Sequence, residues 1–198
     1  VAPNGRVWVT SKAASTISLV DPTSLTVATA VVLDRGAQPH GLVFAPDGSA
    51  AYVVLEGTGR LLKLDPVTGA TLGSVAVGPN VRHVSVSGDS ATLLLPRFVT
   101  PPLPGESTAA VDTSSAGAEV LVVNAATLAV TRTVTLRHSD KTDTEVQGSG
   151  IPNYLGAAAI APDGRSAWVP SKQDNVKRGA LRNGQPLDFQ NTVRAISS

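Results

Sequence analysis

The sequence contains no cysteine and no methionine. The lack of cysteine excludes disulfides, thiolate metal sites, iron–sulfur clusters and covalent haem attachment through Cys-x-x-Cys-His within this chain. We therefore expect no cofactor to be bound by the chain itself. Because the chain begins at Val1 without an initiator methionine, we expect either that a leader has been removed or that the sequence is part of a longer protein.

Excess charge of one sign and long apolar runs are also missing. The chain has 16 basic and 15 acidic side chains, so nothing in its overall charge indicates binding to nucleic acid or to an acidic membrane surface. It has no run of about 18 apolar residues, so we expect no membrane-spanning helix. Val, Ala, Thr, Ser, Gly and Pro dominate instead, a mixture that favours short strands joined by tight turns.

Turn-forming residues recur at the same position of a repeated sequence motif. Each of these turn signals precedes an alternating strand, and each of the last three also follows a short apolar segment. The four turns are at residues 2–5, 45–48, 87–90 and 161–164. The first three begin roughly forty residues apart, the period of repeat proteins that form one propeller blade per unit. The spacing predicts an all-β fold and, within that class, a β-propeller.

The second unit shows the expected blade in full. Strands are predicted at 40–45, 51–55, 60–64 and 71–77, because each alternates or is apolar and is bounded by Gly, Pro or Asp turns. The first unit lacks its first strand and the last stops near its third. We therefore expect about three and a half four-stranded antiparallel blades in one domain, with units near 1–38, 39–80, 81–153 and 154–198. Propellers usually close with four to eight blades, so the chain is expected to belong to a larger closed propeller or to be closed by assembly with another chain.

Several of these phrases resemble the YVTN-type bacterial β-propeller repeat. The matching stretches are 7–10, 38–41, 51–54, 65–69 and 167–170. A narrower resemblance, carried by 151–156, 168–175 and 191–195, is to large secreted bacterial proteins in which such a propeller accompanies a di-haem cytochrome-c-peroxidase-like domain. The resemblance implies an extracellular or periplasmic location, and haem bound by a region outside this chain.

Three long connections are predicted at one face of the propeller. They run from 96 to 118, from 137 to 153 and from 171 to 191. Because binding groups concentrate on loops held by a rigid scaffold, we expect this face to bind a protein partner or an attached domain of the same protein. Unselected variation of loop length on one side is the alternative. The candidate binding residues on this face are Arg97, Asn153, Tyr154 and Lys172.

A second group of candidates lies where the inner strands begin. His40 and Arg82 occupy the same repeat position, and His83 follows Arg82. A polar, cationic channel mouth of this kind can bind an anion or a carboxylate. The alternative is that these groups form hydrogen bonds between neighbouring blades.

Other patterns carry less information. His138, Asp140, Asp143 and Glu145 offer calcium ligands without a calcium-loop pattern, and a solvated loop is the alternative. The basic C-terminal stretch, with Lys172, Lys177, Arg178, Arg182 and Arg194, can dock an acidic partner or simply be solvated. We expect the aromatic residues that recur at equivalent positions to pack between blades; these are Trp8, Tyr52 and Trp168.

Three hypotheses about function follow. The first is a non-catalytic propeller module that binds a partner or an attached domain through its long-loop face. The second is the propeller part of a larger di-haem peroxidase-like oxidoreductase. The third is a propeller hydrolase or lyase with its site at the channel mouth, although the sequence has no Gly-x-Ser-x-Gly, phosphate-loop or dinucleotide motif.

Overall fold

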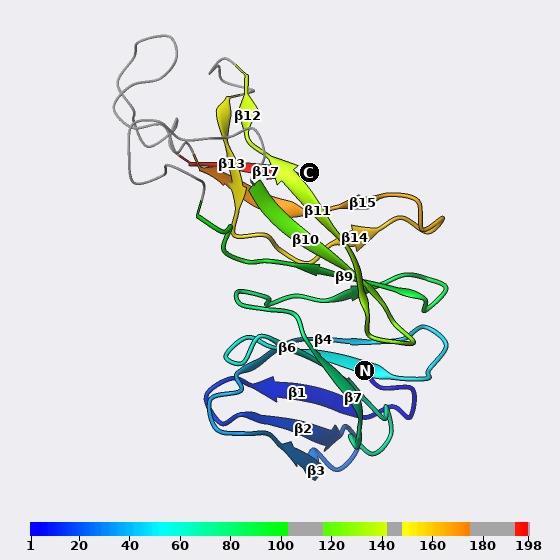
Figure 1. The fold of residues 1–198 in the computed structure, drawn as a ribbon. Helices are drawn as coiled ribbons and strands as arrows, with labels where there is room; N and C mark the ends of the chain where they lie inside the picture. Colours follow the sequence, from blue (N-terminus) through cyan, green and yellow to red (C-terminus); the bar gives the residue numbers. More distant parts are fainter. Residues whose placement is uncertain (103–116, 142–147, 175–192, 198) are drawn as a thin grey trace.

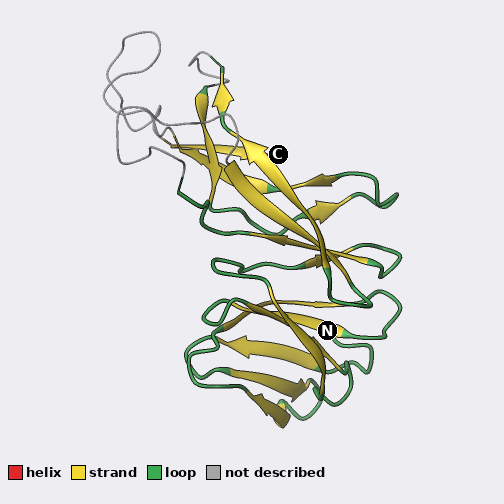
Figure 2. Ribbon diagram, in the orientation of Figure 1, coloured by secondary structure: helices red, strands yellow, loops and turns green. Residues whose placement is uncertain are grey.

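The computed structural model describes residues 1–102, 117–141, 148–174 and 193–197. Every regular element in these residues is a β-strand, as Figure 2 shows. The strands form four successive antiparallel units that follow one another in chain order through the molecule (Figure 1). The predicted all-β fold, built from blade-like antiparallel sheets, is confirmed.

Each of the first three units is a sheet of consecutive strands. The first sheet contains β1 (Val7–Ser11), β2 (Thr16–Asp21) and β3 (Thr26–Val32). The second contains β4 (Pro39–Phe44), β5 (Ala51–Leu55), β6 (Arg60–Leu64) and β7 (Thr71–Ala76). The third contains β8 (Ser85–Val86), β9 (Thr92–Pro96), β10 (Gly117–Asn124) and β11 (Val130–Arg137).

The fourth unit is less regular and begins before residue 154. Its strands are β12 (Ser139–Asp140), β13 (Ser149–Asn153), β14 (Ala159–Ile160), β15 (Ala167–Trp168), β16 (Pro170–Asp174) and β17 (Val193–Ser197). β13 pairs with β16. Residues 149–153, which were expected in the connection from 137 to 153, therefore belong to the sheet of this unit. The inner strand of this unit is interrupted between β13 and β14, where residues 154–158 form no strand and Tyr154 adopts a left-handed φ of 52°.

Hydrophobic cores lie between successive sheets. Ile17 and Leu19 of the first sheet pack with Leu64 of the second, and all three are fully buried. Leu61 of the second sheet and Leu93 of the third belong to the next core. Burial of such side chains contributes roughly 1.5–3 kcal/mol each, so the units are held face to face, as blades are.

Backbone pairing shows which residues are equivalent in successive units. On the inner strand pair, Tyr52 lies opposite Val43, Leu94 lies opposite Ser85, and Trp168 lies opposite Ala159. Tyr52, Leu94 and Trp168 therefore occupy one repeat position. Trp8 pairs with Leu19 as Tyr52 pairs with Lys63, in each case two residues before the Asp that opens the next turn, so Trp8 takes this position in the first unit.

The predicted inter-blade role holds for two of the three recurring aromatic residues. Trp8 packs edge to face on Phe44 of the next sheet, at 5.3 Å between ring centroids. The Tyr52 hydroxyl donates to the Ala125 carbonyl of the third sheet. Trp168, by contrast, is 55% exposed. Each aromatic residue packs on the unit that follows its own, and no described sheet follows the fourth unit.

The turns that join the two inner strands of each unit lie at one edge of the molecule. In Figure 1 the turns between β4 and β5, β8 and β9, and β14 and β15 all lie along the right-hand edge. The Asp47 N–H donates to Ser90 Oγ across two of these turns. The described residues that flank the long connections lie at the other edge, which we call the rim. No helix in the described part of the chain is long and apolar enough to cross a membrane.

Candidate functional site

A row of interacting side chains runs along the rim across all four units. We call it the rim cluster; its members are Lys12, Glu56, Arg82, Phe98, Tyr154, Lys172 and Asp174. Four of these side chains come from one repeat position, four residues beyond the aromatic position of each unit. These are Lys12, Glu56, Phe98 and Lys172.

Glu56 is the ionic centre of the rim cluster. Its Oε2 lies 2.6 Å from Lys12 Nζ of the first unit, and its Oε1 accepts a 2.6 Å hydrogen bond from Arg82 Nε of the third unit. The Glu56 side chain is only 15% exposed. One carboxylate thus links three successive units, with both oxygens bound to cations.

The other half of the rim cluster is a stack of two aromatic rings between two cations. The Arg82 guanidinium lies 3.6 Å from the centroid of the Phe98 ring. Phe98 stacks on Tyr154 of the fourth unit, with centroids 4.8 Å apart and planes 2° from parallel. Lys172 Nζ lies 4.0 Å from the centroid of the Tyr154 ring. Each ring therefore contacts one cation and the other ring, and the stack joins the third unit to the fourth.

Asn153 links the three long connections. Its Oδ1 accepts hydrogen bonds from the backbone N–H groups of Thr100 and Tyr154, and its Nδ2 donates to Asp174 Oδ2 at 2.8 Å. Thr100 Oγ1 also donates to the Pro152 carbonyl. Thr100 lies near the start of the first connection, Asn153 ends the second and Asp174 lies near the start of the third, so described ends of all three meet at one side chain.

Near the rim, the backbone of the second unit lies close to the backbone of the third unit. The Gly41 N–H donates to the Arg82 carbonyl at 2.8 Å. A Cβ atom at Gly41 would lie 2.6 Å from that oxygen, so glycine is required for this approach. Beside this contact the His40 and His83 rings meet edge to face, with centroids 5.4 Å apart.

Two groups of the site have displaced pKa values. Burial alone would raise the pKa of Glu56, but hydrogen bonds from Lys12 and Arg82 outweigh it and hold that pKa below 4.5. Burial, with the nearby His40 and Arg82, lowers the pKa of His83 below 6.5. Glu56 is therefore ionised and His83 neutral near pH 7.

The structure brings together only part of the predicted candidate set. Arg82, Asn153, Tyr154 and Lys172 belong to or contact the rim cluster, and His40 and His83 form the adjoining imidazole pair. Arg97 faces elsewhere: its Nε lies 2.6 Å from Glu119 Oε2, and its Nη1 donates to the Pro79 carbonyl. It therefore bridges strands of the third unit.

Sequence reasoning missed several members of the rim cluster. Lys12, Glu56, Phe98 and Asp174 were not among the candidate binding residues. The signal for three of these four residues was present, because Lys12, Glu56 and Phe98 share the repeat position of Lys172. Asp174 had no such repeat signal.

Some predicted candidates lie outside the described residues. These are Asp143, Glu145, Lys177, Arg178 and Arg182. His138 Nδ1 lies 3.4 Å from Asp140 Oδ1. Within the described ranges, no group of three or more His, Asp or Glu residues is placed to hold a metal ion.

We expect Asn153→Ala to lower the free energy of unfolding by about 1 kcal/mol, because the Thr100 N–H and Asp174 lose their partner. Asn153→Asp should cost more, since it faces the Asp174 carboxylate. Urea denaturation measures both. Asn4→Ala is the control, because Asn4 Oδ1 accepts only the Arg6 N–H in an exposed turn. An Asp variant as stable as the parent would contradict the assigned bond to Asp174.

Comparison with solved structures places the chain among propeller-type proteins. Hydrazine synthase of Kuenenia stuttgartiensis matches 88% of this chain at a TM-score of 0.66 and 19% identity. The dihydro-heme d1 dehydrogenase NirN, in complex with DHE, matches 95% at a TM-score of 0.52 and 17% identity. A putative 6-phosphogluconolactonase from Bacteroides uniformis matches 91% at a TM-score of 0.54 and 17% identity.

The chain spans about half the length of these proteins: 43%, 44% and 54% respectively. No protein-family model and no curated protein sequence matches it. At these identities the likeness concerns the fold alone. The successive antiparallel sheets and the structural neighbours together show that this chain has a β-propeller fold.

Proposed function

We propose that this chain is a non-catalytic interaction module of a secreted or periplasmic protein, which binds a protein partner or an attached domain at its rim. The observation that carries this proposal is the meeting of three long connections at Asn153. A rigid sheet scaffold that gathers several long segments at one place is typical of a binding surface.

The interactions within the rim cluster support a binding role over a catalytic one. Both oxygens of Glu56 are held by cations, and Phe98 and Tyr154 each contact a second ring and a cation. His40 and His83 contact each other edge to face. A nucleophile and its base would instead lie within hydrogen-bond reach of each other. This arrangement makes a propeller hydrolase or lyase, suggested by the lactonase-like neighbour, the weaker alternative.

A second candidate is the propeller part of a larger haem oxidoreductase. The structural likeness to NirN, a dihydro-heme d1 dehydrogenase, favours it, as does the narrower sequence resemblance. Haem would then be bound outside this chain, since the chain has no cysteine. Two Cys-x-x-Cys-His motifs in the same polypeptide would support this candidate, and a gene that encodes only propeller repeats would overturn it.

Site-specific photo-cross-linking tests the binding role. A benzoylphenylalanine replaces Val99, which is 37% exposed beside Phe98 at the rim, or Pro46, which is exposed at the opposite edge. In an extract of the natural source, we expect a discrete cross-linked product from position 99, weakened by Asn153→Asp, and none from position 46. Cross-links from position 46 alone, or none from position 99, would refute a rim interface.

A further inference from the structure

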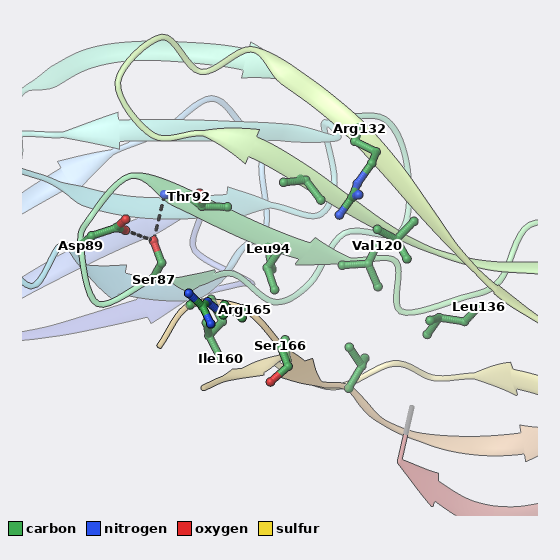
Figure 3. Close-up of a pocket in the computed structure, with 15 residues that line it drawn as sticks. Ser87, Asp89, Thr92, Leu94, Val120, Arg132, Leu136, Ile160, Arg165 and Ser166 are labelled. Carbon is green, nitrogen blue, oxygen red and sulfur yellow. Dashed lines mark hydrogen bonds between the residues drawn. The ribbon is translucent and has the colours of Figure 1, made fainter. Parts of the chain in front are cut away.

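A cavity lies between the third and fourth units, away from the rim cluster. Its volume is about 310 Å³. One wall is formed by β9, β10 and β11, and the other by β14, β15 and the turn between them (Figure 3). Its apolar lining comes from both walls and includes Leu94, Val120, Val134, Leu136, Ile160 and Val169.

The cavity occurs where a large aromatic side chain is replaced by a smaller one. At the junction of the first two units, the repeat position holds Trp8, which packs on Phe44. At the next junction it holds Tyr52, which is 2% exposed in the core. At the third junction the same position holds Leu94, opposite Ser85 in the strand pairing. Leu94 lines the cavity, so the space corresponds to a missing ring.

Two arginine side chains line this cavity from opposite walls. Arg132 comes from β11, and Arg165 from the turn between β14 and β15; Figure 3 shows them on either side of Leu94. Neither guanidinium has an ion pair or hydrogen bond with any residue that the structure describes. The one carboxylate in the lining, Asp89, already accepts bonds from Ser87 Oγ and the Ala91 N–H. The balance of charge in the lining is therefore positive.

We propose that this cavity binds a small aromatic carboxylate. The ring would take the space that Trp8 and Tyr52 fill at the other junctions, between Leu94, Ile160 and Ala167. The carboxylate would face Arg132 and Arg165, whose planar guanidinium groups suit it. The volume is sufficient, since an apolar cavity of about 150 Å³ holds one benzene ring.

The direct test compares two probes of the same shape, 2-naphthoate and 2-naphthamide, by isothermal titration calorimetry. We expect 2-naphthoate to bind with a dissociation constant below about 1 mM and the neutral amide to bind at least about fivefold more weakly. No binding of 2-naphthoate at several-fold higher concentration would overturn the proposal. Equal binding of the amide would overturn the role of the arginines.

Charge variants then test the two arginines. The double variant Arg132→Gln and Arg165→Gln should bind 2-naphthoate and 2-naphthamide about equally. Arg35→Gln removes an exposed arginine from the loop between β3 and β4 and should leave the preference for the carboxylate unchanged. Loss of the preference in the Arg35 variant as well would show a non-specific charge effect and overturn the site.

A cavity-filling variant tests the position of the ring. Leu94→Trp restores the residue type of the first and fourth units and should abolish 2-naphthoate binding while raising the melting temperature. Leu94→Phe, a smaller change, should weaken binding at least about fivefold and serves if the tryptophan variant does not fold. A folded Leu94→Trp protein that binds 2-naphthoate with unchanged affinity would overturn this placement.

Discussion

Phe98→Ala is expected to lower the free energy of unfolding by roughly 2–3 kcal/mol, the largest loss among the rim substitutions. Phe98 fills the space between the Arg82 guanidinium and the Tyr154 ring. Its removal takes away apolar contact area and leaves both neighbours without a partner on one face. Because Phe98 is half-buried, the loss should not exceed the lower limit of about 3 kcal/mol for truncation of a core phenylalanine. Urea denaturation followed by tryptophan fluorescence measures it.

Two further variants distinguish the stack from simple loss of volume. Val99→Ala truncates the next residue, which is more exposed, and should cost less than about 0.5 kcal/mol. Phe98→Leu keeps most of the apolar volume but not the ring, so its cost should fall between the other two. Equal losses for Phe98→Ala and Val99→Ala would show that the stack does not hold the third and fourth units together.

Much of the fold follows from local sequence signals. The strands predicted at 51–55 and 60–64 coincide with β5 and β6, because alternation and the flanking Gly and Asp turns act within a few residues. The Asp65 turn is an example: Asp65 Oδ1 accepts the N–H groups of Val67 and Thr68. Such bonds form from neighbouring residues alone.

The irregular fourth unit and the rim cluster depend on contacts that local signals do not contain. The break in the inner strand at Tyr154 accompanies the stacking of its ring on Phe98, which is distant in sequence. Glu56 has no motif around it, and its partners belong to the first and third units. The one sequence signal for this arrangement is that Lys12, Glu56 and Phe98 occupy the same position in successive repeats.

The exposure of Trp168 illustrates the same limit. Its sequence position is that of the buried Trp8 and Tyr52, so the repeat predicts a core residue. Burial at this position depends on the following unit, however, and not on the residue itself. The position of a residue in the repeat therefore predicts the direction of its side chain. It does not predict burial, which depends on whether another unit packs against that side chain.

Glu56→Gln is expected to lower the free energy of unfolding at pH 7 by roughly 1–2 kcal/mol. Glutamine keeps the shape of Glu56 but cannot neutralise Lys12 and Arg82, and the Arg82 side chain is only 28% exposed. The value is below that for a fully buried pair, because Lys12 is 44% exposed and solvent weakens that contact.

The loss should depend on pH in a defined direction. The pKa of Glu56 in the folded protein lies below 4.5, so the unfolded chain takes up a proton first as the pH falls. The stabilisation by ionised Glu56 is therefore fully present above about pH 4.5 and is lost as the pH falls through the folded-state pKa. The difference between the parent and Glu56→Gln should shrink across that window. Urea denaturation at pH 7 and at successively lower pH values measures it.

A double-mutant cycle separates the ion pair from effects of either substitution alone. Glu56→Gln and Arg82→Gln together should cost less than the two single costs added, because each single variant already breaks the 2.6 Å contact. Asp34→Asn, which changes an exposed carboxylate, is the control and should show little change at either pH. Strict additivity of the two single costs would mean that Glu56 and Arg82 do not stabilise one another. The second and third units would then be joined at the rim mainly by the backbone bond from Gly41 to Arg82.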